Sequence, residues 1–368
     1  MPIELITQKQ NIFEVSLLTL YLDLLHTLLY FIAVNLALKI YPFLENLMVH
    51  KELVTIIIPT YNREKRLPDA IESAINQTYN NIQVIVIDDG SIDKSSDVVK
   101  KYPQVEYYHK ENGGQASARN AGLAHAKGTI IASLDSDDVW HPDFLEKCVT
   151  QLESENLDFV FANWEQESRI GDPWDFLRND PFLTPYYVKE KDNWVILEYP
   201  EVRDLYIKSC PSPSSSVVIR RSAILKGWDE EMNIGDDWCM YLELILNREC
   251  RAAFTLQRLW DKRVDDINVY DGRKWSEVLE FLYIADAKKK IIKFKHLLTS
   301  KERKILEERY MHGLVEFAKH NLIRELNFKY SFHLLIKSFA VNIPFTLKEI
   351  PKVLINSARG KMTVPQKL

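Results

Sequence analysis

Three carboxylates follow a short apolar segment in the first half of the chain. Residues 129–133 (TIIAS) have the composition of a buried strand, and Asp135, Asp137 and Asp138 come directly after it. Carboxylates crowded at one strand end repel one another and stay ionised only beside positive charge. A hard divalent cation such as Mg²⁺ or Mn²⁺ takes such oxygen ligands and commonly shares them with a phosphate. The pattern indicates a metal site; an acidic turn before a helix beginning near Asp138 is the alternative.

Two further predicted strands also end in polar residues. Residues 54–58 and 84–87 are apolar, β-branched runs, and Asp88 and Asp89 follow the second run directly. Between them, residues 67–77 carry apolar side chains at helical spacing, so the order is strand, helix, strand. This alternation predicts a mostly parallel sheet, which binds ligands beyond the carboxyl ends of its strands. Several polar strand ends together favour a binding site over solvated turns.

Length, cysteine content and the first residues limit the class of protein. The chain of 368 residues allows one to three domains, and its four cysteines form no CxxC pair. This usage favours a reducing compartment and argues against a structural zinc site. The first residues include Glu4 and no basic region, so no cleavable signal peptide is expected.

Charge is distributed unevenly along the chain. Residues 288–368 contain 18 Lys or Arg and 6 Asp or Glu, a net charge of +12; because the whole chain carries −5, residues 1–287 carry −17. The acidic part suits cation binding. In the basic part, lysines interleave with apolar residues, which favours an anionic membrane surface over nucleic acid, with a solvated helix face as the alternative. The interleaved residues are Lys293, Lys295, Lys329 and Lys337 with Phe294, Phe328, Phe332, Leu334, Leu335 and Phe339.

A second apolar feature lies near the amino terminus. Residues 15–38 are mostly apolar but include Asp23, His26 and Asn35. A membrane span needs roughly 20 apolar residues, and an Asp near its centre costs about 2.5–3.5 kcal/mol. We therefore rank an amphipathic helix, lying on a surface or packed on protein, above a span. Together with the basic carboxyl-terminal part, it predicts peripheral membrane contact and a cytoplasmic location at the inner face of the membrane.

Taken in order, the motifs resemble those of the inverting family 2 glycosyltransferases over roughly residues 52–270. The matching stretches are 54–62 (VTIIIPTYN), 77–79 (QTY), 87–91 (IDDGS), 112–122 (NGGQASARNAG), 126–128 (AKG), 134–138 (LDSDD), 227–230 (GWDE) and 235–238 (GDDW). The resemblance implies a GT-A-like α/β fold, with a mostly parallel sheet flanked by helices, and a nucleotide-sugar donor bound at the strand ends.

Positions that match the family's donor-binding motifs are Pro59, Tyr61, Asp88, Asp89, Arg119, Asp135 and Arg263. Tyr61 is placed to offer an aromatic face to the base, and Asp89 to accept the imide N–H of uracil or thymine. Arg119 is placed to reach the diphosphate. The alternatives are core packing for Tyr61, a helix cap for Asp88 and Asp89, and a structural ion pair for Arg119.

The resemblance also implies the roles of the two acidic motifs. Asp135 would contact the ribose and Asp137 would bind Mg²⁺ or Mn²⁺, while Asp138 would orient the metal or cap the next helix. In the later motif, Asp237 would be the general base for the acceptor hydroxyl, with Asp236 as its orienting neighbour. A single carboxylate base with direct displacement predicts inversion. Capping of the helix predicted over residues 238–245 is the rival role for either residue.

Two departures narrow the expected function. The family's Arg-x-His-like element has Arg263 as its counterpart, but the histidine is absent, so no metal ligand is carried over from it. Residues 257–260 (QRLW) have the wrong spacing for the Gln-x-x-Arg-Trp motif of processive synthases. The chain is therefore expected to add one or a few sugars to a glycan or lipid-linked acceptor. A nucleotide-sugar-binding regulator without catalysis and, less favoured, a processive synthase are the alternatives.

The remaining segments suggest the domain organisation. Aromatic residues between 164 and 208 suit an acceptor site or the packing of an irregular insert, and residues 210–216 lead into a strand expected over 217–219. After residue 275 the spacing predicts helices over 275–298, 301–326 and 330–339, with breaks at Pro344 and Pro351. We therefore expect an apolar helical segment over 1–50, a catalytic domain over 51–272 and a basic helical region over 273–368. The catalytic domain would divide into a donor half (51–150) and an acceptor half (151–272).

Overall fold

The computed structural model of the chain describes residues 26–27, 29–36, 39, 51–166, 174–263 and 272–358. Residues 1–51 and residues 52–368 form two compact units. In the first unit, residues 26–27, 29–36 and 39 are helical and exposed, and most of the predicted apolar segment over 15–38 lies outside the described residues. None of the helices in the described part of the chain is long and apolar enough to cross a membrane.

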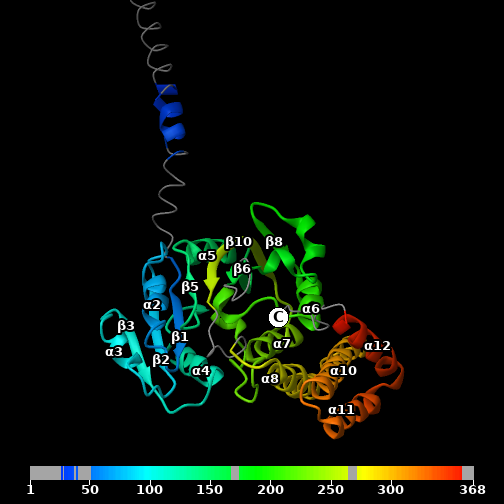
Figure 1. The fold of residues 1–368 in the computed structure, drawn as a ribbon. Helices are drawn as coiled ribbons and strands as arrows, with labels where there is room; N and C mark the ends of the chain where they lie inside the picture. Colours follow the sequence, from blue (N-terminus) through cyan, green and yellow to red (C-terminus); the bar gives the residue numbers. More distant parts are fainter. Residues whose placement is uncertain are drawn as a thin grey trace, which may run out of the picture. The chain divides into compact units, whose positions relative to one another are not determined.

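The second unit is built on a ten-stranded mixed sheet (Figure 1). Along the sheet the order is β3-β2-β1-β4-β9-β6-β10-β5, with β7 beside β6 and β8 beside β10. The strands are β1 (Val54–Thr60), β2 (Ile82–Asp88), β3 (Val105–His109), β4 (Ile130–Ser133), β5 (Val139–Trp140), β6 (Phe159–Gln166), β7 (Trp174–Asp175), β8 (Trp194–Leu197), β9 (Val217–Arg220) and β10 (Ala252–Lys262).

The amino-terminal half of this sheet is parallel, as the sequence predicts. Strand β1 pairs in parallel with β2 and β4, and β2 with β3, so their carboxyl ends share one edge. Every residue of β1 is buried, which explains its unbroken apolar run. Strand β9 is antiparallel to both β4 and β6 and joins the two halves.

Helices α2 (Leu67–Ile75), α3 (Ser95–Val99), α4 (Gln115–His125) and α5 (Phe144–Ser154) connect these strands. Helix α4 lies directly on β1: a Cβ at Gly122 would be 2.3 Å from Cγ2 of Ile57, so only glycine permits this approach. The alternative of a helix beginning near Asp138 is wrong. Residues Val139–Trp140 instead pair with β10 as β5, and α5 begins at Phe144.

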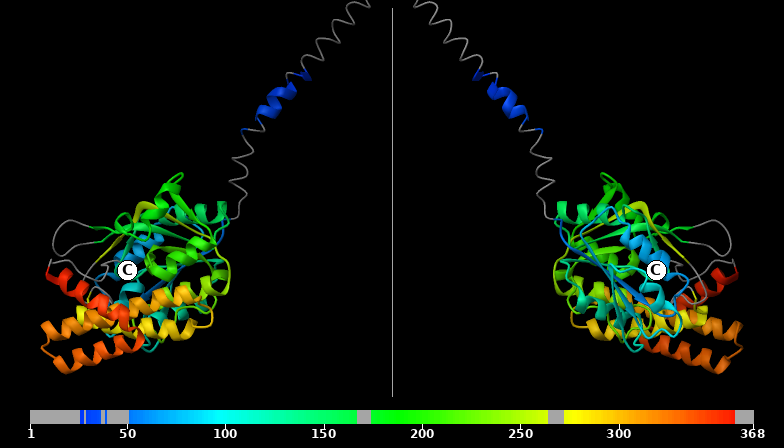
Figure 2. Two further views of the ribbon diagram at one scale, coloured as in Figure 1. Left: turned by 90° about the vertical axis from the view of Figure 1, so that its right-hand side faces the viewer. Right: turned by 90° about the vertical axis from the view of Figure 1, so that its left-hand side faces the viewer.

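Helices of the second half cover the sheet and extend away from it (Figures 1 and 2). They are α6 (Tyr199–Lys208), α7 (Asp236–Asn247), α8 (Trp275–Val278), the π-helix η5 (Leu279–Asp286), α9 (Ala287–Phe294), α10 (Ser300–Ile323), α11 (Phe328–Val341) and α12 (Ile343–Ala358), with 3₁₀ turns η1 (Leu177–Asn179), η2 (Thr184–Lys189), η3 (Ser214–Ser216) and η4 (Arg221–Ala223). The expected break at Pro351 is wrong, because α12 continues through it, whereas a break does occur next to Pro344, between the end of α11 at Val341 and the start of α12 at Ile343. Pro344 lies in the first turn, where no intrahelical N–H bond is lost.

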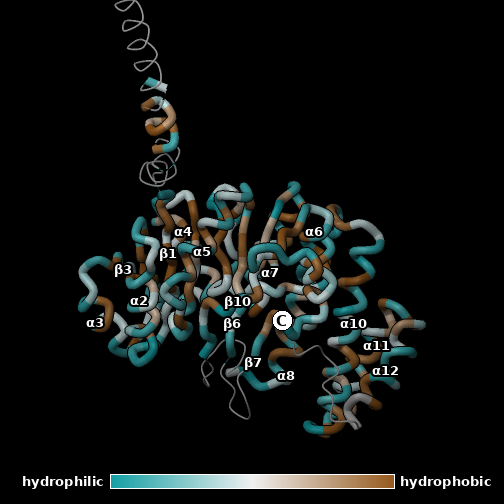
Figure 3. Tube along the Cα trace, turned by 90° about the horizontal axis from the view of Figure 1, so that it is seen from above, coloured by the Kyte–Doolittle hydropathy of each residue, from teal (hydrophilic) through white to brown (hydrophobic). Residues whose placement is uncertain are grey.

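The hydrophobic core has two adjoining parts. The larger one fills the space between the sheet and its helices and includes Phe294 and Leu306 from the carboxyl-terminal region. The smaller one lies between η5 and α10 and includes Leu282, Tyr283 and Leu314. Hydrophobic residues concentrate on the central strands, whereas α10 to α12 carry both hydrophobic and hydrophilic residues (Figure 3). The carboxyl-terminal helices therefore share their core with the sheet.

Candidate active site

A cavity of about 670 Å³ lies at the carboxyl ends of β1 and β4, beside the first turns of α4 and α7. Most residues predicted for the site line it: Pro59, Tyr61, Asp89, Arg119, Asp135, Asp137 and Asp237. Asp138 and Asp236 are buried next to these residues. Because the strand ends of a parallel sheet converge, residues far apart in sequence meet here.

The first acidic motif forms a compact cluster. Asp135, Asp137 and Asp138 present carboxylate oxygens that all lie within 4.8 Å of one another. Burial raises the pKa of Asp138 well above its ordinary value, Lys262 opposes this, and the neighbouring carboxylates add to it. The negative charge of the cluster is thus not fully balanced by the protein. An all-oxygen donor set of this size and charge fits Mg²⁺ or Mn²⁺.

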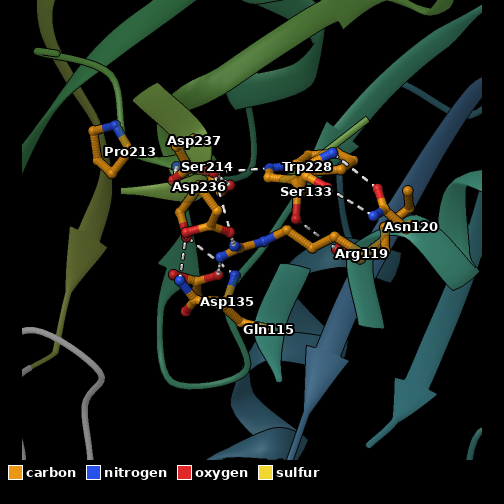
Figure 4. Close-up of polar contacts among 12 residues, drawn as sticks. Gln115, Arg119, Asn120, Ser133, Asp135, Pro213, Ser214, Trp228, Asp236 and Asp237 are labelled. Atoms are coloured by element: carbon orange, nitrogen blue, oxygen red, sulfur yellow. Dashed lines mark hydrogen bonds and ion pairs between the residues drawn. The ribbon is translucent and has the colours of Figure 1, made fainter. Parts of the chain in front are cut away.

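Arg119 of α4 joins the two acidic motifs. Its guanidinium donates to Asp135 Oδ1 and to Asp236 Oδ2, each over 2.7 Å, and lies 3.7 Å from Asp237 Oδ1 (Figure 4). The side chain is buried, which alone would lower its pKa, but the three carboxylates raise the pKa above its ordinary value. Burial likewise opposes ionisation of Asp135, and Arg119 and Lys262 outweigh it, so the pKa of Asp135 is lowered. Arg119 therefore holds the motifs at a fixed separation as a charged group.

The second acidic motif occupies the first turn of α7. Asp236 is buried and accepts hydrogen bonds from Gln115 Nε2 and Arg119 Nη1. Burial and repulsion by Asp237 raise the pKa of Asp236 to about 7, although Arg119 and Gln115 oppose the shift. Asp237 lines the cavity. The helix amino terminus favours negative charge on both residues.

Three donors fix the carboxylate of Asp237. Ser214 donates through Oγ to Oδ1 over 2.5 Å and through its backbone N–H to Oδ2 over 3.0 Å. Trp228 donates through Nε1 to Oδ1 over 2.8 Å, and its own backbone is held by Asn120 of α4 (Figure 4). A carboxylate with both oxygens constrained in this way has one orientation towards the cavity. The sequence analysis missed Ser214 and Trp228 as site residues.

Segment 213–216 connects Asp237 to the acidic cluster. Ser215 donates through Oγ to Asp138 Oδ2 over 2.7 Å and accepts from the backbone N–H of Asp135 over 3.0 Å. Its neighbour Ser214 binds Asp237. Adjacent serines thus align two motifs that lie about 100 residues apart in the chain. The serine-rich composition was visible in the sequence, but only the fold shows what the hydroxyls contact.

The two aspartates at the end of β2 differ in placement: Asp88 is its last residue and Asp89 follows it. Asp89 lines the cavity, but its carboxylate already accepts from Lys110 Nζ and from the backbone N–H groups of Gly113 and Gly114. Gly114 has φ of 88°, a conformation that a side chain would disfavour. Asp88 is buried and accepts from Tyr107 Oη and the backbone N–H of Ser91. Asp89 thus lines the cavity, whereas Asp88 is buried and is not among its lining residues.

Positive residues near the cluster include two that the sequence analysis missed. Arg63 lines the cavity and binds Asp137 Oδ2 over 3.0 Å, and Lys262 at the end of β10 also lines it. The predicted Arg263 is not among the lining residues; it pairs with Asp69 of α2 and donates its backbone N–H to Asp138. Arg63 was detectable as a basic residue four positions beyond Pro59, whereas Lys262 depends on the path of β10.

The loop before Asp236, residues 233–235, is fixed by hydrogen bonds to the carboxyl-terminal region. Asp286, the last residue of η5, is fully buried and accepts four hydrogen bonds, from the backbone N–H groups of Asn233, Ile234 and Gly235 and from Asn233 Nδ2. One turn further along, Lys290 lies 3.7 Å over the ring of Trp238, and its Nζ has no hydrogen-bond partner. Burial lowers the pKa of Lys290 to about 7. These helices therefore set the position at which α7 begins.

Part of the cavity lining is apolar. It includes Trp164, Phe176, Cys210, Pro213, Ile234, Trp238 and Leu282. Trp164 stacks between Phe176 and Trp260. Tyr206 is instead packed in the core against Phe159 and Tyr241. The aromatic residues between 164 and 208 thus divide between cavity lining and core packing.

Comparison with known proteins identifies the class of domain. Residues 55–225 match the family model described as glycosyl transferase family 2. An uncharacterized glycosyltransferase of Rickettsia typhi is 31% identical over 220 residues, which cover 59% of this chain and 65% of that protein. In three further rickettsial glycosyltransferases the aligned part is 21%, 26% and 30% of their length, so the chain spans less than a third of those proteins.

Solved structures of low identity share the fold. TarS of S. aureus (residues 1–349, in complex with UDP-GlcNAc) matches with a TM-score of 0.52 at 17% identity, covering 84% of this chain and 92% of that chain. The mannosyltransferase PcManGT of Pyrobaculum calidifontis, in complex with GDP-Man and Mn²⁺, matches with a TM-score of 0.50 at 18% identity, covering 84% and 81%. The fold is thus that of the GT-A nucleotide-sugar transferases. Residues 55–225 therefore match the family 2 glycosyltransferases, the family whose motifs the sequence resembles.

Proposed function

We propose that this chain transfers a sugar from a nucleotide-sugar donor to a glycan or lipid-linked acceptor, with inversion at the anomeric carbon. The observation that carries the proposal is that Asp237, the predicted base, lines the same cavity as Asp135 and Asp137. A donor held by the acidic cluster would have its anomeric carbon between the cluster and Asp237. This is the arrangement that a direct displacement requires.

The donor side of the cavity suits a nucleotide diphosphate. Tyr61 is half exposed beside Pro59 and can offer its ring to a base, as the sequence suggested. Arg63 and Lys262 supply positive charge for phosphate oxygens at the same edge. The relatives solved with UDP-GlcNAc and with GDP-Man support a nucleotide-sugar donor. We keep UDP- and dTDP-sugars as the expected donors.

Asp135, Asp137 and Asp138 would hold Mg²⁺ or Mn²⁺, and Mn²⁺ in the related mannosyltransferase supports this assignment. When bound, the cation would stabilise the negative charge of the departing diphosphate. On the other face, Asp237 would accept the proton of the acceptor hydroxyl as that oxygen attacks. Ser214 and Trp228 would keep the carboxylate of Asp237 oriented towards the acceptor hydroxyl. Arg119 would fix the distance between Asp237 and the donor.

The apolar part of the cavity lining would contact the acceptor. Pro213 and Trp238 belong to it and are the sequence neighbours of Ser214 and Asp237, so the acceptor would lie beside the proposed base. The location at the inner face of the membrane, predicted from the sequence, stays a prediction.

The test is nucleotide release from UDP-, dTDP- and GDP-sugars with Mn²⁺, Mg²⁺ or EDTA, using slow donor hydrolysis where no acceptor is known. We expect one donor to turn over only with metal, and Asp237→Asn to lower its rate by about 100-fold or more. Asp204→Asn is the control, because Asp204 is an exposed aspartate on α6 that pairs with Lys208.

Two other results would contradict the proposal. Metal-dependent donor binding without turnover, with and without candidate acceptors, would support a nucleotide-sugar-binding regulator. If no donor binds under any condition, the assignment of the donor pocket is wrong.

A further inference from the structure

The outer faces of α11 and α12 expose an unusual number of large apolar side chains. Phe328 and Phe332 are each 66% exposed, and Ile343 and Leu347 are 57% and 59% exposed. We call this surface the α11–α12 face; its residues are Phe328, Lys329, Phe332, Ile336, Lys337, Ile343, Leu347, Lys348, Lys352 and Leu354. Figures 1 and 2 show both helices at the periphery of the second unit. Large apolar surfaces of this kind mark interaction sites.

In α11 the apolar and basic residues form adjacent stripes. Phe328, Phe332 and Ile336 are spaced by four residues and lie along one line of the helix. Lys329 comes directly after Phe328 in the sequence, and Lys337 directly after Ile336. Each lysine therefore lies about 100° further around the helix than the apolar residue before it. The third side of the helix holds the buried Leu334 and faces the protein.

Helix α12 repeats this arrangement. Ile343, Leu347 and Leu354 are exposed along one line, and Lys348 and Lys352 are exposed beside it. The opposite side carries the buried Thr346, Glu349 and Val353. Both helices thus show the same order of apolar, basic and buried stripes. This repetition indicates that their outer faces form one interaction surface.

Specific contacts hold the inner sides of both helices in place. Ser338 of α11 and Thr346 of α12 share a hydrogen bond of 2.8 Å. His312 of α10 contacts Glu349 of α12 over 2.7 Å. The exposed apolar stripes are therefore presented by an ordered three-helix arrangement.

The charge of this surface is positive. Arg324, Lys329, Lys337 and Lys348 are exposed, and Lys352 is exposed beside Glu349. Within the described stretch 324–355, Glu349 is buried and Glu325 is the exposed acidic residue.

The basic segment of α9 does not extend this surface, contrary to the interleaving read from the sequence. Lys293 binds Asp229 over 2.6 Å and Phe294 lies in the core, because α9 packs against the catalytic unit. In α9, Ile292 is the exposed large apolar residue, with Lys288 and Lys295 exposed nearby, whereas α11 and α12 each expose several such residues.

We propose that the α11–α12 face docks on the surface of a lipid bilayer rich in anionic lipids. Apolar stripes flanked by lysines are the pattern of interfacial helices, whose apolar residues enter the acyl boundary while lysines contact anionic headgroups. A second copy of the chain fits less well, because a two-fold contact through this face would bring its own lysine rows together. The proposal goes beyond glycosyl transfer, and its test uses no enzymatic activity.

The test uses the full chain with a single environment-sensitive fluorophore on a cysteine placed at Phe332 or at Leu347. The four native cysteines are buried, so an introduced surface cysteine is labelled selectively. Vesicles of phosphatidylcholine, alone or with phosphatidylglycerol, are then added. We expect blue-shifted and brighter emission at both positions with phosphatidylglycerol, weakened by salt. A label at Val188, an equally apolar residue that is 90% exposed on η2, should not respond.

Charge reversal provides the second measurement. Lys329→Glu with Lys337→Glu should weaken co-sedimentation with phosphatidylglycerol vesicles by about tenfold or more. Lys100→Glu with Lys101→Glu, which reverses two exposed lysines on the opposite half of the sheet, is the matched control. Equal loss in both double variants would overturn the proposal, because it would reflect net charge alone.

Three further results would overturn it. If the protein sediments with vesicles while the labels at 332 and 347 stay silent, another part of the chain binds the lipid. If both labels respond to protein concentration without vesicles, the face binds a second copy. An equal, salt-independent response to phosphatidylcholine alone would exclude recognition of anionic lipid.

Discussion

Arg119 and Asp236 form a buried pair whose protonation is set by their neighbours. Burial and Asp237 raise the pKa of Asp236 to about 7, whereas an unfolded aspartate titrates near pH 4. Between these values the folded chain holds a proton that the unfolded chain has lost. The free energy of unfolding should therefore decrease as the pH rises from about 4 to about 7, by up to about 1.4 kcal/mol per pH unit from this group.

Asp236→Asn tests this dependence because asparagine does not titrate. Urea unfolding of both proteins at several values between about pH 5 and about pH 8 should show that the variant gains stability relative to the wild type as the pH rises. The comparison isolates Asp236 from other titrating groups. Parallel curves would show instead that Arg119 keeps Asp236 ionised over the whole range.

Trp228 acts on the reaction through Asp237. In Trp228→Phe the ring still fills its buried position, but the 2.8 Å hydrogen bond from Nε1 to Asp237 Oδ1 is lost. A hydrogen bond to a charged group is worth about 1.5–3 kcal/mol, and its loss should lower kcat by about 10- to 100-fold with little change in the donor KM.

A raised donor KM with an unchanged kcat would contradict this positioning role. Trp275→Phe is the control, because Trp275 is a half-buried tryptophan on α8 outside the cavity lining.

At the scale of elements, η5 and α9 position the start of α7. Asp286→Ala removes an acceptor of four hydrogen bonds and leaves the amides of residues 233–235 without this partner in a buried loop. We expect a loss of about 3 kcal/mol or more in the free energy of unfolding and a fall in kcat. Glu280→Ala, on the exposed side of the same π-helix, should leave both unchanged.

Asp286→Asn separates the two effects. The amide keeps an acceptor oxygen for the loop, so stability should recover in part, and kcat should recover with it if the loop sets the position of Asp237. Full stability with the low kcat of the alanine variant would place the role of Asp286 outside the loop. Thermal unfolding and nucleotide release measure the two quantities.

The elements differ in how far the sequence predicts them. Strands β1, β2 and β4 and helix α7 follow from apolar patterns within one segment. The polar end of β4 identified Asp135 and Asp137, whereas Asp237 was assigned from the resemblance to the family's later acidic motif. Ser214 and Ser215 could not be assigned in this way, because their partners lie 23 and 77 residues away. The same holds for Asp286, whose role depends on a contact 51 residues distant. Local spacing shows where strands and helices end, whereas contacts between distant segments depend on packing.

At the scale of the whole molecule, residues 1–51 form a compact unit separate from residues 52–368. The strands, the cavity and both hydrophobic clusters belong to the second unit. A chain of residues 52–368 should therefore unfold at the same midpoint as the full chain and bind donor equally well. Calorimetry and donor titration check this, and a large drop in either quantity would show that the first unit supports the site.

Removal of the carboxyl-terminal region should have the opposite result. Phe294 and Leu306 belong to the main core, and Arg203 of α6 is paired with Glu302 of α10 over 2.6 Å. Arg203 and the Thr299 cap lower the pKa of Glu302 to about 2, against burial, so this pair stays ionised at neutral pH. A chain ending at residue 272 would lose these contacts and those of Asp286, and would expose the apolar surface beneath them.

Such a chain should be recovered in aggregates or show no cooperative unfolding by circular dichroism. A chain truncated after residue 327, which keeps η5, α9 and α10 but lacks α11 and α12, is the matched control and should retain cooperative unfolding at reduced stability. If the chain ending at 272 unfolds cooperatively near the midpoint of the full chain, residues 273–368 are an independent appendage. In that case the first turn of α7 would hold Asp236 and Asp237 in place without support from η5, and the effect expected for Asp286→Ala would fail with it.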